Sequence, residues 1–314
     1  MTAPEADPAT TLAGLKPKTK APSSARVLET WIAQAEHAAG VDGGRLGWLV
    51  ATTVVTAALQ RAVDDHGQSR FLLKGGTLLQ HRLGLAARAT RDLDGLVRGD
   101  VDTFLTDLEA ALAEPWGPLR LSRSAVEVIE TPTRVVKPRR FDVVVDLQGK
   151  TWRRIQVEIS PDEGAAGQHP EFVLAPRLDG VGLPSPDRLA TLALNYQVAQ
   201  KVHAVSDPHD PPAAINDRAR DVADLLLLRD LIETTGTPTR AELRGAIHDV
   251  FAARAADAAV LGRPPRTWPT TITAHPHWRT DFTVAAAVTG TDLTLAEAVA
   301  HANDWLAAIE DAAT

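Results

Sequence analysis

The sequence predicts an α/β protein of the α+β kind, with a mixed-sheet N-terminal lobe followed by an all-helical C-terminal lobe. Up to about residue 180, short apolar runs alternate with stretches of helical spacing, whereas the pattern is helical from Asp187 onward. The chain has 314 residues, of which 44% are hydrophobic, enough for two domains. We expect a disordered tail at 1–25, an α/β lobe at 26–180 and a helical lobe at 181–314.

The first half of the α/β lobe alternates helices with short buried strands. The apolar periodicity predicts helices at Leu28–Ala39, Leu46–Val63 and Val101–Leu112. Another helix should carry Leu78, Leu79, Leu83 and Leu85. Strands are predicted at Phe71–Leu73, which runs into Gly75 and Gly76, and at Leu93–Val97.

The second half of this lobe is rich in strands, and helices follow it. Strands are predicted at Leu119–Ile129, Phe141–Leu147 and Ile155–Ile159, with a further one at Phe172–Leu174. Gln148, Gly149 and Lys150 should form the turn between the second and third of these. Helices are predicted at Leu189–Val205, Ala219–Leu231, Ala241–Val260 and Leu295–Ile309, separated by Pro-rich segments at 208–212 and 264–269.

The composition excludes several classes of protein. Without cysteine the chain has no disulfides, thiolate catalysis or cysteine zinc site. Its apolar stretches are too short for a membrane span, so we expect a cytoplasmic protein. The net charge is -7, yet residues 118–155 hold nine basic and four acidic residues, a local charge of +5. This window is either a solvated strand face or a patch that binds nucleic-acid backbone.

The segment from Phe71 to Asp94 has the residues of a phosphate and metal site. Two glycines between a strand and a helix let backbone N–H groups approach a phosphate closely. Asp92 and Asp94 lie two residues apart on the next strand, so their side chains share one face. Their carboxylates repel each other unless a cation lies between them, and oxygen ligands of this kind suit Mg²⁺. Each feature alone is more often a turn or a solvated edge, but together they indicate phosphoryl transfer with metal ions.

The segment FLLKGGTLLQHRLGLAARATRDLDGLV, at 71–97, resembles the signature of the AbiEii/MenT-type nucleotidyltransferase toxins of type IV-like toxin–antitoxin systems. QKVHAV at 200–205 and NDRARDVADLLLL at 216–228 resemble two later motifs of that family, so the likeness spans roughly 70–230. The resemblance implies a nucleotidyltransferase-like fold for the first lobe.

The resemblance also implies roles for particular residues. Gly75 and Gly76, with their neighbours Lys74 and Thr77, would lie against the nucleotide phosphates, and Asp92 and Asp94 would hold Mg²⁺. Lys201 would contact the triphosphate, and either Asp221 or Asp224 would complete the last motif. By itself, Lys201 also reads as a solvated lysine on an amphipathic helix, and the two aspartates as partners of a nearby arginine.

A third carboxylate is expected on a neighbouring strand. The candidates are Asp142, Asp146 and Glu158, and Glu158 fits the family pattern best. Thr90 lies two residues before Asp92, so a phosphate there would add negative charge and block nucleotide binding. As a loop threonine it also reads as a simple turn former.

The resemblance implies transfer of a nucleotide, with NTP as co-substrate, to the 3′ end of tRNA, with a preference for pyrimidines and a block of translation. An antitoxin is the implied protein partner. Arg218, Arg220 and the basic window would then hold the acceptor stem. Two alternatives remain open, namely a small-molecule or protein acceptor, and a nucleotide-binding module without catalysis.

Overall fold

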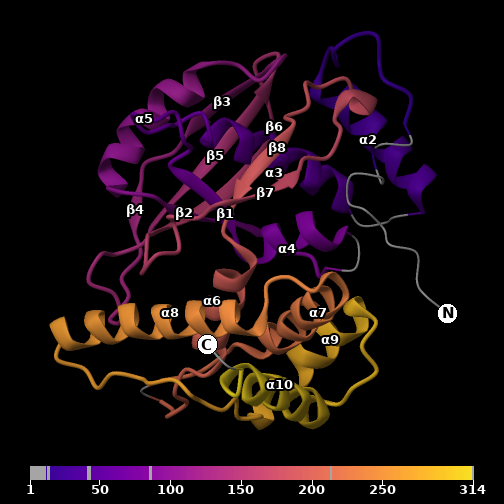
Figure 1. Ribbon diagram of the computed structural model, residues 1–314. Helices are drawn as coiled ribbons and strands as arrows, with labels where there is room; N and C mark the ends of the chain where they lie inside the picture. The colour runs from indigo at the N-terminus through magenta and orange to yellow at the C-terminus, as the bar shows by residue number, and fades with distance from the viewer. Residues whose placement is uncertain (1–11, 13–14, 41–43, 85–86, 213, 313–314) are drawn as a thin grey trace.

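A mixed β-sheet forms the first lobe, and a layer of helices packs along one side of it in the computed structural model (Figure 1). The structure describes residues 12, 15–40, 44–84, 87–212 and 214–312. The α+β fold class predicted from the sequence is confirmed: the described residues form a sheet of eight strands, and helices follow it in the chain.

The sheet has the strand order β3-β5-β6-β2-β1-β8-β7, and β4 pairs with β5 beside this path. The pairs β1/β8 and β2/β6 are parallel, and the other pairs are antiparallel. The strands are β1 (Phe71–Lys74), β2 (Asp92–Val97), β3 (Leu119–Arg123), β4 (Glu127–Val128), β5 (Arg139–Leu147), β6 (Lys150–Pro161), β7 (Glu171–Leu174) and β8 (Arg188–Thr191).

Four helices belong to the sheet lobe within the described residues: α2 (Ala25–Ala39), α3 (Arg45–Leu59), α4 (Gly75–Leu83) and α5 (Val101–Ala113). Helix α3 is buried on nearly all sides, with contacts to α2, α5 and β6, which explains why its sequence is apolar all round. The second lobe contains α6 (Leu194–Val205), α7 (Ala219–Thr235), α8 (Arg240–Val260), α9 (Arg279–Thr289) and α10 (Leu295–Glu310). Short 3-10 helices lie at Asp179–Val181 and Pro276–Trp278.

The two faces of the β5–β6 hairpin have different environments. Residues such as Val143, Ile155 and Val157 are fully buried on one face, whereas Asp142 and Glu158 on the other face are only partly covered. The hairpin turns at Gln148 and Gly149, both with positive φ, as the sequence predicted. This alternation leaves one polar face of the sheet turned away from the core.

The predicted helix at Leu189–Val205 is wrong in its first residues. Arg188–Thr191 is strand β8, and the helix begins only at Leu194. A short apolar run is compatible with either a buried strand or a buried helix. Here the run forms a strand, because it pairs with β1 and β7. The sheet therefore extends past residue 180. The sequence reading also missed α9, and it merged β3 and β4 into one strand at Leu119–Ile129.

Part of the predicted tail packs against the body of the protein. The side chain of Leu12 is buried, and the backbone N–H of Lys18 donates to the carbonyl of Asp179. Residues 1–11 and 13–14 of that segment, and Leu85 of the predicted fourth helix, lie outside the described residues. None of the described helices combines the length and the apolar composition that crossing a bilayer requires.

Candidate active site

Asp92 and Asp94 lie at the centre of the sheet, on β2 between β1 and β6. The antiparallel register places Lys74 opposite Asp94, and the parallel register places Glu158 opposite Asp94. Because both carboxylates occupy alternate positions of one strand, they project from the same polar face, as the sequence predicted. Strand pairing thus brings residues from three separate segments to one place.

Gly75, at the junction of β1 and α4, makes room for Asp94. Its φ is +67°, and a Cβ placed on it would lie 2.1 Å from Oδ2 of Asp94. Gly76 is packed against Thr90, where an added Cβ would lie 3.2 Å from the threonine Oγ1. The first turn of α4 has no side-chain cap, so its N–H groups remain available to an anion beside Asp94.

Thr77 has a structural contact in this turn. It is fully buried, and its hydroxyl donates to the carbonyl of Asp92 at 2.9 Å. Thr90 also contacts this carbonyl, at 3.4 Å from its hydroxyl. These contacts hold the start of β2 against α4, so they position the aspartates.

A cavity of about 420 Å³ lies between the sheet and the helical lobe. Asp94 and Glu158 face it from the sheet, and Lys201 and Asp221 face it from α6 and α7. The residues that line the cavity also include Lys74, Gly75, Gly76, Arg88, Arg134, Ser160, Gln197, Gln200, Arg218 and Arg254. The tertiary structure therefore brings the three motif regions of the sequence around one space.

The two aspartates have raised pKa values. Burial is the largest cause at Asp92, followed by the negative charge of Glu158. Burial also raises the pKa of Asp94, against the nearby ammonium of Lys74, while Glu158 and Asp92 raise it further. The charge of Glu158 adds to the raised pKa of both aspartates, and a divalent cation would relieve this repulsion.

Glu158 is the one of the three candidate acids that lies beside Asp94. Its Oε1 accepts from Nε and Nη2 of Arg140 at 2.9 and 2.6 Å, and from Gln156 at 3.3 Å. Gln156 also donates to Oδ1 of Asp92 at 2.9 Å, so it links the two acids. Asp142 pairs with Arg154 at 3.1 Å on the next strand.

Asp146 lies at the far end of the same strand, with Leu147 next to the turn. Register therefore separates Asp146 from Asp94 and places Glu158 directly opposite it. Among the residues that the structure describes, no three carboxylates or histidines converge closely enough to enclose an ion. Asp92 and Asp94 instead form a two-carboxylate face, the arrangement that Mg²⁺ shares with substrate phosphates in many enzymes.

Lys201 is buried, and its ammonium donates to both later aspartates. The distances are 2.6 Å to Oδ1 of Asp221 and 2.6 Å to Oδ2 of Asp224. These carboxylates raise the pKa of Lys201 although burial alone would lower it. Asp224 is fully buried and also accepts two hydrogen bonds from Arg88. The reading of Lys201 as a solvated lysine does not fit this position.

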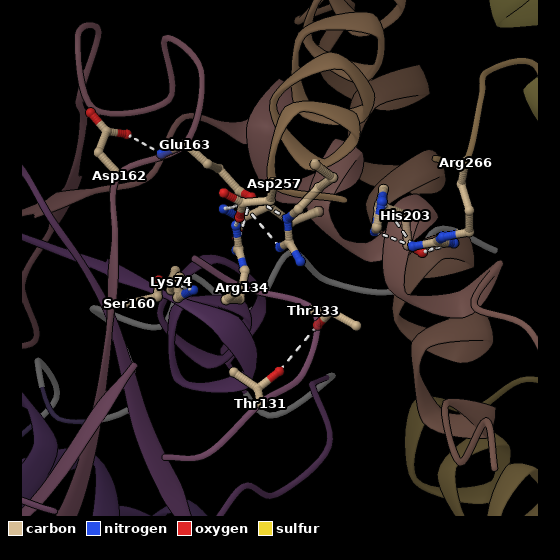
Figure 2. A network of polar contacts seen from close by, with 12 residues as sticks. Lys74, Thr131, Thr133, Arg134, Ser160, Asp162, Glu163, His203, Asp257 and Arg266 are labelled. Carbon is tan, nitrogen blue, oxygen red and sulfur yellow. Dashed lines mark hydrogen bonds and ion pairs between the residues drawn. The ribbon is translucent and has the colours of Figure 1, made fainter. Parts of the chain in front are cut away.

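A second charged cluster joins the lobes beside the cavity (Figure 2). Glu163 follows β6, and its buried carboxylate pairs with Arg134 at 2.9 Å and with Arg254 of α8. The positive neighbours lower the pKa of Glu163 to about 2. Lys74, whose pKa burial lowers, donates to Ser160 at 2.7 Å nearby.

The sequence reading missed this cluster and the amide of Gln156. Gln156, Glu158 and Ser160 alternate along β6, so the same period-two argument used for Asp92 and Asp94 points to them. The partners of Glu163 come from a loop and from a helix far along the chain, and no local pattern marks them. Only folding brings these residues together.

Most of the basic window is neutralised by neighbouring acids. Five of its nine basic residues form ion pairs: Arg123 with Glu109, Arg134 with Glu163, Arg140 with Glu158, Arg153 with Glu29 and Arg154 with Asp142. These ion pairs reduce the positive charge that the window presents to a ligand. Outside this window, Arg218 lines the cavity and Arg220 pairs with Asp281, and each has nearly 60% of its side chain accessible.

Comparison with known families shows the family to which this chain belongs. The family described as nucleotidyl transferase AbiEii toxin, Type IV TA system, matches residues 57–309. The chain belongs to this AbiEii family. The match covers the glycine pair, the two aspartates and the Lys201 region, so the resemblance in the sequence motifs is confirmed. As a member of this family, the chain is a nucleotidyltransferase of toxin–antitoxin type.

Two solved structures resemble the AbiEii-family chain. One is MenT4, a nucleotidyltransferase toxin from Mycobacterium tuberculosis H37Rv, with 16% identity and a TM-score of 0.48 over 91% of this chain and 99% of that one. The other is an antigenic nucleotidyltransferase-like protein from Paracoccidioides brasiliensis, with 11% identity and a TM-score of 0.33 over 69% of this chain and 93% of that one. No curated protein matches the chain significantly.

Proposed function

We propose that this AbiEii-family enzyme transfers a nucleotide, with a preference for pyrimidines, from NTP to the 3′ end of tRNA in a Mg²⁺-dependent reaction. The observation that carries the proposal is the cavity in which Asp94 and Glu158 of the sheet face Lys201 of α6. Carboxylates on one wall and a buried cation on the other match the needs of phosphoryl transfer. Modification of the 3′ end of tRNA would block translation.

Asp92 and Asp94 would hold Mg²⁺, with Glu158 as the candidate third ligand. Their raised pKa values and shared face fit a cation site. The metal, when bound, would neutralise negative charge on the attacking and leaving oxygens. Glu158 would join the site by exchanging its hydrogen bonds with Arg140 for the metal. One of these carboxylates would accept the proton of the attacking hydroxyl.

The triphosphate would lie between α4 and α6. The free N–H groups after Gly75 and Gly76 would bind phosphate oxygens, with the helix N-terminus favouring negative charge. Lys201 has three donors and uses two of them on aspartates, so one remains for the pyrophosphate leaving group. Lys74, at the end of β1, would add positive charge near the same phosphates.

The acceptor strand would approach over Arg218 and Arg220 at the start of α7. Arg218 lines the cavity, Arg220 lies two residues further along the chain, and both exposed side chains suit phosphate contacts that orient an RNA end. A toxin of this family implies an antitoxin partner, and a tRNA substrate implies action in the cytoplasm. Phosphorylation of Thr90, packed against Gly76, would place negative charge in the phosphate site and block it.

The test is transfer of each α-labelled NTP to total tRNA with Mg²⁺, comparing the native chain with Asp92→Ala. The matched control is Asp142→Ala, a carboxylate on the same sheet face that pairs with Arg154. We expect label in tRNA with the native chain and the control only, and removal of Mg²⁺ should abolish it. NTP binding without transfer to tRNA would instead favour a protein or small-molecule acceptor, and no NTP binding would refute catalysis.

A further inference from the structure

Arg88 lies in the loop before β2 and reaches across to the helical lobe. Its Nε donates to Oδ1 of Asp224 at 3.1 Å, and its Nη2 donates to Oδ2 at 3.0 Å. The backbone of Arg88 is fixed in turn, because the buried amide of Gln80 donates to its carbonyl at 3.0 Å. A planar guanidinium that donates to both oxygens of one carboxylate fixes the orientation of that carboxylate.

Asp224 and Asp221 have different environments, although both bind Lys201. Asp224 is fully buried, and both of its oxygens are engaged by Arg88 and Lys201. Asp221 lines the cavity, and Arg218 is its other cationic neighbour at 4.0 Å. Asp224 therefore acts as an internal connector, and Asp221 is the aspartate that faces the substrate space.

We propose that Arg88 is a positioning residue, which fixes Lys201 at the cavity wall by holding Asp224 with two parallel hydrogen bonds. This proposal rests on the proposed function, because it assigns Lys201 to the triphosphate. It also divides the roles of the two aspartates: Asp224 orients Lys201, and Asp221 contacts the substrate side. Arg88 links the loop that leads into the catalytic aspartates with the helix that supplies Lys201, so it couples the two walls of the cavity.

A buried ammonium with a movable carboxylate partner would lose its fixed direction. Without Arg88, Asp224 would keep only Lys201 as its cationic partner and could rotate within its pocket. The ammonium of Lys201 would then move together with the carboxylate of Asp224, or it would pair with Asp221 alone. Since charge stabilisation depends on donors that are already in place, the loss should lower the rate of transfer more than the binding of NTP.

The test combines a double-mutant cycle with NMR of the lysine side chains. The variants are Arg88→Met, Arg88→Lys, Asp224→Asn and the double variant Arg88→Met/Asp224→Asn. Arg229→Met serves as the control, because Arg229 lies on the same helix as Asp224 and pairs with its neighbour Asp230. The chain has seven lysines, so the ammonium signal of Lys201 can be followed directly without NTP. Thermal unfolding of each variant checks that it folds.

We expect Arg88→Met and Asp224→Asn each to shift the Lys201 signal and to lower kcat by about 100-fold with a smaller change in KM. Arg88→Lys should be faster than Arg88→Met but slower than the native chain. An ammonium cannot donate to both oxygens of Asp224 in the fixed geometry of the Arg88 guanidinium. The double variant should be about as slow as either single one. A Lys201 signal that is unchanged in Arg88→Met would overturn the proposal, and so would multiplied losses in the double variant, which would indicate that Arg88 contacts substrate on its own.

The NMR measurement separates this proposal from the proposed function. If the native chain transfers no nucleotide but the Lys201 signal still responds to Arg88→Met, the positioning role stands and the assigned reaction is wrong. If transfer occurs and the signal does not respond, the reaction stands and the role of Arg88 is wrong.

Discussion

The carboxylate of Asp94 lies directly over the Cα of Gly75, so that a Cβ at position 75 would be 2.1 Å from Oδ2. Gly75 also has a φ of +67°, which residues with a side chain adopt only at a cost. In the proposed function, Gly75 would open the N-terminus of α4 to a phosphate and would also leave space for the acid that holds the metal. One glycine would then serve both parts of the proposed site.

Gly75→Ala should abolish transfer while the fold is retained. The new methyl group would displace Asp94 from the sheet face, and we expect kcat to fall by about 100-fold or more. The positive φ alone should destabilise the protein by about 1 kcal/mol. Gly236→Ala is the control for strain, because Gly236 has a φ of +72° and no atom within 4 Å of an added Cβ. Equal activity in the two variants would contradict this account.

Asp92→Asn should stabilise the metal-free protein while it removes activity. Burial and the charge of Glu158 raise the pKa of Asp92 above its ordinary 3.8, so the native state keeps this proton to a higher pH than the unfolded chain. The free energy of unfolding therefore falls as pH rises through that range, and the cost persists at neutral pH. Removing the charge should raise Tm at pH 7 by about 1–3 °C.

Thermal unfolding in a chelator, with and without added Mg²⁺, measures this effect. Mg²⁺ should raise Tm of the native protein and leave Tm of Asp92→Asn unchanged, because a metal that binds only the folded state stabilises it. Asp142→Asn, on the same face and paired with Arg154, should respond to Mg²⁺ as the native chain does. If metal-free Asp92→Asn has a lower Tm than the metal-free native protein, the charge of Asp92 does not destabilise the native state through burial and repulsion from Glu158.

Glu163→Gln should destabilise the contact between the lobes. It leaves the buried Arg134 and the partly buried Arg254 without their shared carboxylate, and removal of one partner from a buried ion pair costs about 3 kcal/mol. The pKa of Glu163 is about 2, below its ordinary 4.5, so its contribution is complete above pH 4.5 and disappears as pH falls toward 2. Urea unfolding at pH 7 and pH 3 measures both effects.

The difference in unfolding free energy between native and Glu163→Gln proteins should shrink at the lower pH. Glu233→Gln, at the exposed end of α7, serves as a control for loss of a carboxylate outside the cluster. If the difference in unfolding free energy between the native and Glu163→Gln proteins stays constant with pH, the ionised Glu163 does not stabilise the contact between the lobes.

Arg140→Met should let Mg²⁺ bind more tightly. Arg140 donates two hydrogen bonds to Oε1 of Glu158, so it competes with a cation for the candidate third ligand. We expect the Mg²⁺ concentration for half-maximal transfer to fall by about threefold to tenfold, a change of about 1 kcal/mol in binding. Glu158→Gln should raise this concentration instead. If Arg140→Met changes nothing, Glu158 does not act as a metal ligand.

The sequence by itself determined the local parts of the site. The period of two places Asp92 and Asp94 on one face of a strand, and a glycine pair between a strand and a helix leaves backbone N–H groups open. The motif regions around Lys201 and Asp221 were recognisable by their likeness to a family, and the family match over residues 57–309 confirms the likeness. These features depend on neighbouring residues, which a sequence displays directly.

The tertiary structure decided which distant residues complete the cavity. Strand register selects Glu158 over Asp142 and Asp146, because the parallel β2/β6 pairing puts it opposite Asp94. Burial separates Asp224, held by Arg88, from Asp221 at the cavity wall. The short apolar run that begins at Leu189 forms a strand because it pairs with β1 and β7. Pairing, burial and ion-pair partners link residues far apart in the chain, and local sequence patterns do not contain that information.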